Sequence, residues 1–214
     1  MPHAIYQAFF EHPALIVQMV KREVFIRYRG SFLGLFWSFL NPLLMLALYS
    51  FVFTVVFTPR WEQALTSQSQ YVLILFCGLT FHGFLAEILQ RSPMVIVSNT
   101  NFVKKVMFPL EILPLIVTGS ALFHLAITST VLFLCAVVVN HSLPWTLVYF
   151  PLLLLPFTLL ACGISWLLAA LGVYLRDISQ VMGLITSVLL FMSPILFPRQ
   201  PCLRDFSHFC TSTH

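Results

Sequence analysis

Residues 110–139 read LEILPLIVTGSALFHLAITSTVLFLCAVVV, and this stretch decides the fold class. Glu111 is the only Asp, Glu, Lys or Arg residue in it. The stretch is longer than the roughly 20 helical residues that are needed to cross the hydrocarbon core of a bilayer. A lone strand would leave its backbone polar groups unpaired in hydrocarbon, so a segment of this kind must be a helix. The pattern predicts a membrane-spanning helix at Leu110–Val139.

Four further apolar stretches are long enough to cross a bilayer in the same way. We place them at Phe32–Thr58, Tyr71–Gln90, Leu147–Tyr174 and Ile178–Pro198. The chain of 214 residues is 59% hydrophobic and 8% charged, whereas soluble domains average about 25% charge. One core cannot hide so much apolar surface, so lipid must be the solvent for much of it. The sequence therefore predicts an all-α, polytopic membrane helix bundle with five spans.

Positive charges fall in alternate connections between these spans. The segment before the first span holds Lys21, Arg22, Arg27 and Arg29, the second connection holds Arg91, Lys104 and Lys105, and the fourth holds Arg176. The first connection has only Arg60, and the third, Asn140–Thr146, has neither lysine nor arginine. Because cytoplasmic loops are enriched in these residues, we expect the N-terminus inside and, after five spans, the tail outside.

The basic segment 1–30 is too polar to be a span. Its apolar residues at helical spacing are Ile16, Met19, Val20 and Val24, and Gln18, Lys21 and Arg22 fall on another face. This pattern predicts an amphipathic helix on the inner membrane surface, with basic side chains toward anionic lipid. The interface residues that we expect are Lys21, Arg22, Arg27 and Arg29. The alternative is an ordinary basic flank that only fixes orientation. No long apolar core followed by small residues begins the chain, so we expect no cleavable signal peptide.

Signatures of catalysis are missing from the sequence. It contains no GxxxxGK[ST] phosphate loop, no HExxH and no GxSxG. Paired carboxylates within a span are also absent, since Glu87 and Glu111 sit near predicted span ends. We therefore expect a protein that is not an enzyme and has no cofactor or metal, so that energy for any work comes from another chain.

Polar residues inside spans are costly and are functional candidates by default. Ser120, His124 and Thr128 follow one another at intervals of four and form one stripe that could line a path for a hydroxyl-rich substrate. The alternative is that the stripe hydrogen-bonds to a neighbouring helix. His82 leaves the same two alternatives open.

Two acidic residues have structural explanations. Glu87 precedes Arg91 by four residues, the order that favours an intrahelical ion pair. Glu111 lies in the first turn of the third predicted span, where the helix dipole favours a negative charge.

Three motifs stand in order along the chain. They are KREVFIRYRGSFLG at 21–34, followed by Trp37 and Asn41-Pro42; NTNFVKKVMFPLEILP at 99–114; and Arg176-Asp177-Ile178, followed by SPILFP at 193–198. Together they resemble the permeases of ABC-type exporters for polysaccharide and polyol phosphate. The resemblance runs from about residue 15 to residue 198.

This resemblance implies the membrane-spanning permease subunit of an ABC transporter in the bacterial cytoplasmic (inner) membrane. Two permease chains would form a homodimer and pair with two copies of a separate ABC ATPase subunit. The exported substrate would be an undecaprenyl-linked polysaccharide, of the lipopolysaccharide O-antigen, capsule or teichoic acid type. Its lipid-bound end would enter from the cytoplasm, and the glycan would pass through a channel between the permeases. Membrane lipids are the other expected partner, and nucleic acid is not expected.

The segment before the third span is the expected contact with the ATPase. Its candidate docking residues are Asn101, Phe102, Lys104, Lys105, Met107 and Phe108. The two phenylalanines and the methionine could anchor in a cleft of the ATPase, with the lysines as charges at its rim. The alternative is a plain basic loop that only fixes orientation.

The chain departs from the family pattern at two places. Leu110 stands where the family usually has arginine, and residues 199–214 are polar and without periodicity where the family continues into a sixth span. We therefore divide the chain into a basic segment 1–30, a permease domain 31–198 and a disordered or frame-shifted tail 199–214.

This tail leaves a second function open, in which the chain is a non-transporting permease fragment or a membrane interaction subunit. Such a chain would insert but not support export. We expect small and polar residues that a sixth span would contact to lack partners, namely Gly163, Ser165, Gly183, Thr186 and Ser187.

Overall fold

The computed structural model describes residues 13–52, 68–99, 109–140, 150–175 and 177–193. Its helices are α2 (Pro13–Tyr28), α3 (Trp37–Phe51), α4 (Gln68–Arg91), α5 (Val95–Ser98), α7 (Ile112–Asn140), α8 (Phe150–Tyr174) and α9 (Ile178–Met192). Two 3₁₀ turns precede α3 and α5, namely η1 (Gly34–Phe36) and η3 (Ser92–Met94). The described residues contain no strand, and the all-α prediction is confirmed.

Four of the described helical segments are long and apolar enough to cross a bilayer. They are Gly34–Phe51, Val72–Ser98, Ile112–Val139 and Phe150–Tyr174. Their outward faces carry exposed leucines, such as Leu152 and Leu159, as expected where lipid is the solvent. The fifth predicted span is present as the shorter apolar helix α9, and residues 194–198 of that prediction lie outside the described residues.

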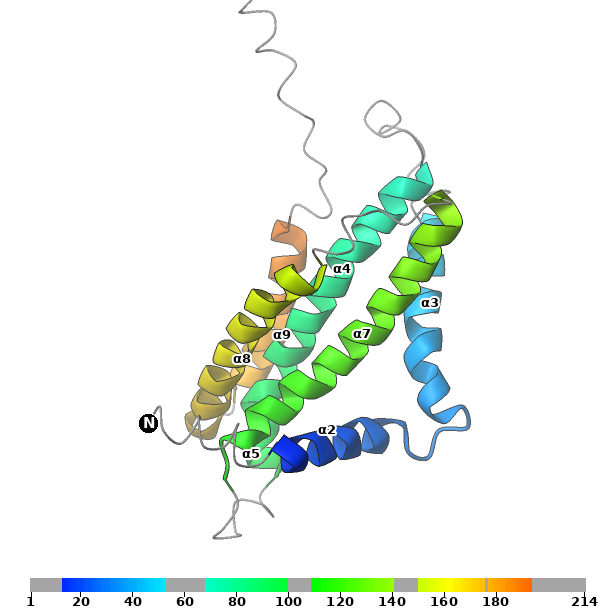
Figure 1. The fold of residues 1–214 in the computed structure, drawn as a ribbon. Helices are drawn as coiled ribbons and strands as arrows, with labels where there is room; N and C mark the ends of the chain where they lie inside the picture. Colours follow the sequence, from blue (N-terminus) through cyan, green and yellow to red (C-terminus); the bar gives the residue numbers. More distant parts are fainter. Residues whose placement is uncertain (1–12, 53–67, 100–108, 141–149, 176, 194–214) are drawn as a thin grey trace, which may run out of the picture.

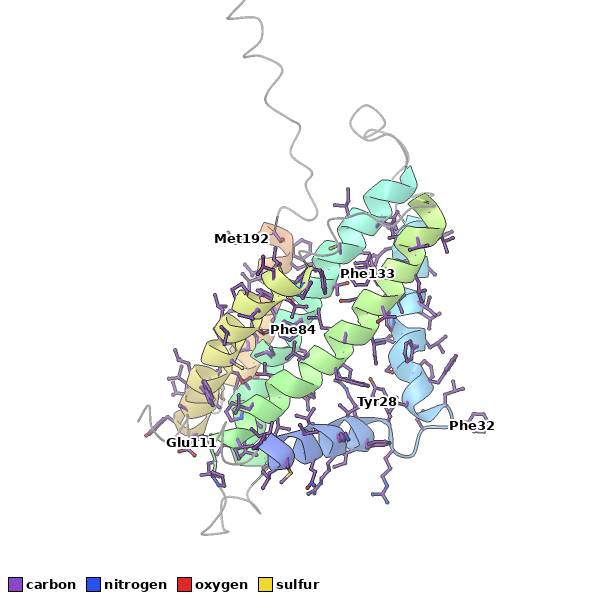
Figure 2. The ribbon with its side chains drawn as sticks, in the orientation of Figure 1. Tyr28, Phe32, Phe84, Glu111, Phe133 and Met192 are labelled. Carbon is purple, nitrogen blue, oxygen red and sulfur yellow. The ribbon has the colours of Figure 1, made fainter. Side chains whose placement is uncertain are left out.

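The long helices run side by side, and α2 lies across one end of them (Figure 1). Its apolar residues Leu15, Ile16, Met19 and Val20 pack against a buried cluster formed by α5, α7 and α8. Glu111 lies at this same end of the bundle and Met192 at the opposite end (Figure 2). The N-terminal segment and the described ends of the second and fourth connections therefore gather together, as the loop charges predict.

Helix α9 is attached to α4 through polar contacts at Thr186. His82 Nε2 lies 3.0 Å from the Thr186 carbonyl oxygen, which can only accept, so this nitrogen carries a proton. Gln90 Nε2 donates to the Thr186 hydroxyl at 3.2 Å. The polar group of His82 therefore joins two helices.

Of the five small and polar positions expected to lack partners, Ser165 and Thr186 have them. The Ser165 hydroxyl is fully buried and lies 2.8 Å from the Ser92 hydroxyl of η3. The expectation is therefore wrong for these two residues, because earlier segments of the chain already supply their partners, namely η3 and α7 beside Ser165 and α4 beside Thr186. Gly163 does face open space, and Ser187 is exposed.

Helix α8 comes into close contact with η3 at Gly172. A Cβ atom at this position would lie 1.8 Å from the carbonyl oxygen of Pro93, which belongs to rigid, buried backbone. The absence of a side chain at Gly172 is therefore what allows the Ser92 and Ser165 hydroxyls to meet nearby.

We expect the substitution Gly172→Ala to destabilise the bundle by about 1–3 kcal/mol, because the added methyl group must push α8 away from η3. Gly163→Ala is the matched control, since its added Cβ would have no neighbour within 4 Å and alanine favours the helix. Thermal unfolding of both variants in detergent compares them. Equal unfolding temperatures would show that the contact does not constrain α8.

Candidate functional site

A group of charged and polar side chains joins α2 to α4 and α7. Its members are Glu23, Arg27 and Tyr28 of α2, Glu87 and Arg91 of α4, and Ser120 and His124 of α7. We call these seven residues the ion-pair layer. Each helix contributes a pair of residues four positions apart, so both members of a pair lie on the same helix face.

Glu87 is at the centre of the layer, and its side chain is only 14% exposed. Its Oε1 atom accepts from Arg27 Nη1 at 2.5 Å and from Arg91 Nη1 at 3.0 Å. Its Oε2 atom lies 2.9 Å from His124 Nδ1. The carboxylate of α4 is therefore held from α2, from α7 and from its own helix, and the predicted pair with Arg91 is confirmed.

Arg91 bridges two carboxylates. Besides Glu87, its guanidinium group contacts Glu23 of α2, and it donates to the buried Ser120 hydroxyl at 3.0 Å. The two guanidinium groups of the layer thus face two carboxylates, and their formal charges cancel. Such compensation allows charges to lie within an apolar bundle, where a lone ion would cost several kcal/mol.

His124 extends the layer to Tyr28. A carboxylate can only accept, so His124 Nδ1 carries the proton of its contact with Glu87. Its Nε2 atom lies 3.1 Å from the Tyr28 hydroxyl. Burial raises the pKa of Tyr28, outweighing the opposite effect of Arg27, so the phenol stays protonated at neutral pH and can donate to this nitrogen.

A cavity of about 380 Å³ lies on one side of the layer, between α2, α3, α4 and α7. Besides members of the layer, its lining includes Trp37 and Asn41 of α3, Thr80 of α4, and Leu125 and Thr128 of α7. Hydroxyl, amide and aromatic groups thus face one space, a mixture suited to a ligand with both polar and apolar parts.

A second cavity of about 360 Å³ lies on the other side of the layer, at the end of the bundle where α2 and α5 meet. Its lining includes Met19, Glu23 and Ile26 of α2, Gln90 and Arg91 of α4, Ser98 of α5, and Leu113 and Val117 of α7. Among the described residues, no group of three or more His, Cys, Asp and Glu side chains comes together as a metal site requires.

The three residues of the predicted polar stripe on α7 lie in different surroundings. His124 and Thr128 line the first cavity, whereas Ser120 is 1% exposed and contacts Arg91. The Thr128 hydroxyl donates to the His124 carbonyl oxygen of its own helix at 2.9 Å. Hydrogen bonds to neighbouring helices thus occur at Ser120 and His124, and a substrate path along the stripe stays a prediction.

One of the four basic residues predicted for the membrane surface also contacts an acidic residue of the bundle. Lys21, Arg22, Arg27 and Arg29 are all exposed, and the guanidinium group of Arg27, whose side chain is 46% exposed, also contacts Glu87. Arg27 therefore has an acidic partner on α4, and its place at the membrane surface stays a prediction. All six candidate docking residues, Asn101 to Phe108, lie outside the described residues.

The sequence interpretation did not include Glu23 and Tyr28 and treated Glu87 as purely local. One signal was available, since an ionisable residue in an apolar run is a functional candidate by default and Glu87 stands in such a run. Its partner Arg27 on α2 is 60 positions away in the chain, and Glu23 is 68 positions from Arg91, separations to which no spacing rule applies.

Comparison with known proteins adds an independent finding. A family model described as "ABC-2 type transporter" matches residues 14–213. An O-antigen export system permease protein RfbA of Myxococcus xanthus is 26% identical over 194 residues, which cover 91% of this chain and 72% of the relative. Two such proteins of Klebsiella pneumoniae are each 26% identical over 199 residues, or 92% of this chain and 74% of the relative.

We expect Glu87→Ala to destabilise the chain by about 3 kcal/mol, because Arg27, Arg91 and His124 would lose their shared acceptor inside the bundle. Glu111→Ala is the matched control, since Glu111 is exposed. Its hydrogen bond with Trp166 uses the backbone carbonyl oxygen, which the substitution keeps. Denaturation in detergent measures both. If the two variants were equally stable, Glu87 would not be the centre of the layer.

Proposed function

The chain belongs to the ABC-2 type transporter family, and on this basis we propose that it is the permease subunit of an ABC transporter that exports lipid-linked polysaccharide. It is a multi-pass protein of the inner membrane. The observation that carries the proposal is the match of nine-tenths of the chain to permeases named for O-antigen export. The homodimer and the ATPase partner are parts of the proposal.

The geometry supports a role in which force from a partner reaches the spans through α2. This helix lies across one end of the bundle (Figure 1), and its charged half contacts α4 at Glu87 and Arg91 and α7 at His124. A partner that moves α2 would therefore act on two spans at once. Since the sequence has no phosphate loop of its own, we propose that a separate ATPase supplies this force from the end where α2 lies.

We expect deletion of the gene in its source organism to remove one polysaccharide from the cell surface and leave its lipid-linked form inside the cell. The reason is that synthesis would continue while the step across the membrane would be lost. A lectin or antibody against the polymer, applied to intact and to lysed cells, measures the two pools. A plasmid with the intact gene should restore the surface pool, and one with an early stop codon should not. An unchanged surface pool would contradict export and favour a non-transporting role.

The docking residues give a second test. We expect Phe102→Ala combined with Phe108→Ala to reduce co-purification of the ATPase at least five-fold, since interface aromatic residues often carry about 2 kcal/mol or more of binding energy each. Phe191→Ala is the matched control, because this exposed phenylalanine lies on α9 near Met192, away from α2. Both variants should still insert into the membrane. Equal recovery of the ATPase with both variants would exclude docking through these two residues.

A further inference from the structure

The two cavities meet at the ion-pair layer. On each of three helices, a residue that lines the second cavity lies within about one turn of a residue that lines the first cavity. The neighbouring lining residues are Ile26 and Arg27 on α2, Arg91 and Glu87 on α4, and Val117 and Ala121 on α7. Between Val117 and Ala121 on α7 lies Ser120, a member of the layer that lines neither cavity and accepts a hydrogen bond from Arg91. A single layer of side chains thus separates the cavities.

We propose that the ion-pair layer is a gate, closed in this structure, between the two cavities. Separation of Arg27 from Glu87, of Glu23 from Arg91 and of Tyr28 from His124 would open it. The two cavities would then form one continuous space along the inner side of α2. Trp37, Asn41 and Thr128 of the first cavity would become accessible from the end of the bundle where α2 lies.

The layer is arranged so that both states of the gate are electrostatically tolerable. When the charged half of α2 moves away, Glu87 keeps its contacts with Arg91 and His124. The charges that leave belong to Arg27 and Glu23, whose side chains are already 46% and 36% exposed. Opening therefore leaves no buried charge without a partner, whereas loss of the Glu87 carboxylate would remove the partner of the buried end of Arg91.

The rest of α2 restricts which part can move. Its first half is held by apolar packing, and Val20 lies so close to α7 that a Cβ atom at Gly119 would be 2.6 Å from it. Its second half carries the charges and one buried apolar side chain, Val24, and leads into Gly30, whose φ of 91° is a left-handed conformation that glycine adopts without strain. The structure therefore favours a movement in which residues 23–28 swing away while residues 15–20 stay in place.

The test measures thiol accessibility, so it does not rest on export activity. The five native cysteines are replaced by alanine, and Thr128→Cys then places one thiol on the wall of the first cavity. A negatively charged methanethiosulfonate, which does not cross hydrocarbon, is added to inverted or right-side-out membrane vesicles. In the otherwise unchanged background, we expect slow labelling from both sides.

The opening variant combines Glu23→Gln with Arg27→Gln, because this pair leaves Glu87 compensated and keeps the net charge constant. We expect at least ten-fold faster labelling of Thr128→Cys from the side of α2 and no change from the other side. The control variant combines Lys21→Gln with Arg29→Gln, two exposed positions outside the layer, and should label slowly.

A thiol at Ser165 distinguishes opening of the gate from general loosening. Ser165 is fully buried between α7, α8 and η3 and lines neither cavity. We expect Ser165→Cys to stay unreactive in every background. Equal labelling of Thr128→Cys in the opening variant and in its parent would overturn the gate. Reactivity of Ser165→Cys in the opening variant would overturn it as well, since the layer would then only stabilise the fold.

Discussion

A carboxylate that is only 14% exposed within an apolar bundle is largely cut off from bulk water, and this constraint on Glu87 organises one end of the molecule. Its charge must be balanced by side chains that reach it from other helices. Arg91 is available on the same helix, but the second Oε atom and the remaining lone pairs need His124 and Arg27. Helix α2 is thereby held across the ends of α4 and α7 by charge as well as by apolar contact.

Hydroxyl groups in the same helices are satisfied at much lower cost. Thr80, Thr118 and Thr130 each donate to the carbonyl oxygen four residues earlier in their own helix, so none of them needs a partner on another helix to be satisfied. Among the described residues, polar contacts between spans include the Ser92–Ser165 pair, those at Thr186, and those of Glu87 and Arg91 with His124 and Ser120. Since each such bond contributes only about 0.6 kcal/mol in a membrane, close packing at positions such as Gly172 must supply most of the specificity.

Prediction from the sequence was successful where the rule was local. Length and apolar content gave the spans, and spacing gave both the helix before them and the Glu87–Arg91 pair. The ion-pair layer could not be derived in this way, because a spacing of four places two residues on one face but does not say which helix lies opposite. Arg27 illustrates the limit, because its position on a basic helix predicts contact with lipid headgroups, and only the fold shows that the Glu87 carboxylate also lies within its reach.

The two halves of α2 respond differently to a force at this end of the bundle. Apolar packing around Val20 is nearly independent of direction and is lost in proportion to the area exposed. The ion pairs are directional, and once separated their charged groups are solvated by water, which repays much of the lost attraction. Under the proposed function, a partner that acts on α2 would therefore displace its charged half first and leave its apolar half attached. One helix can then remain anchored to the spans and still change its contact with Glu87, a combination that uniform apolar packing would not provide.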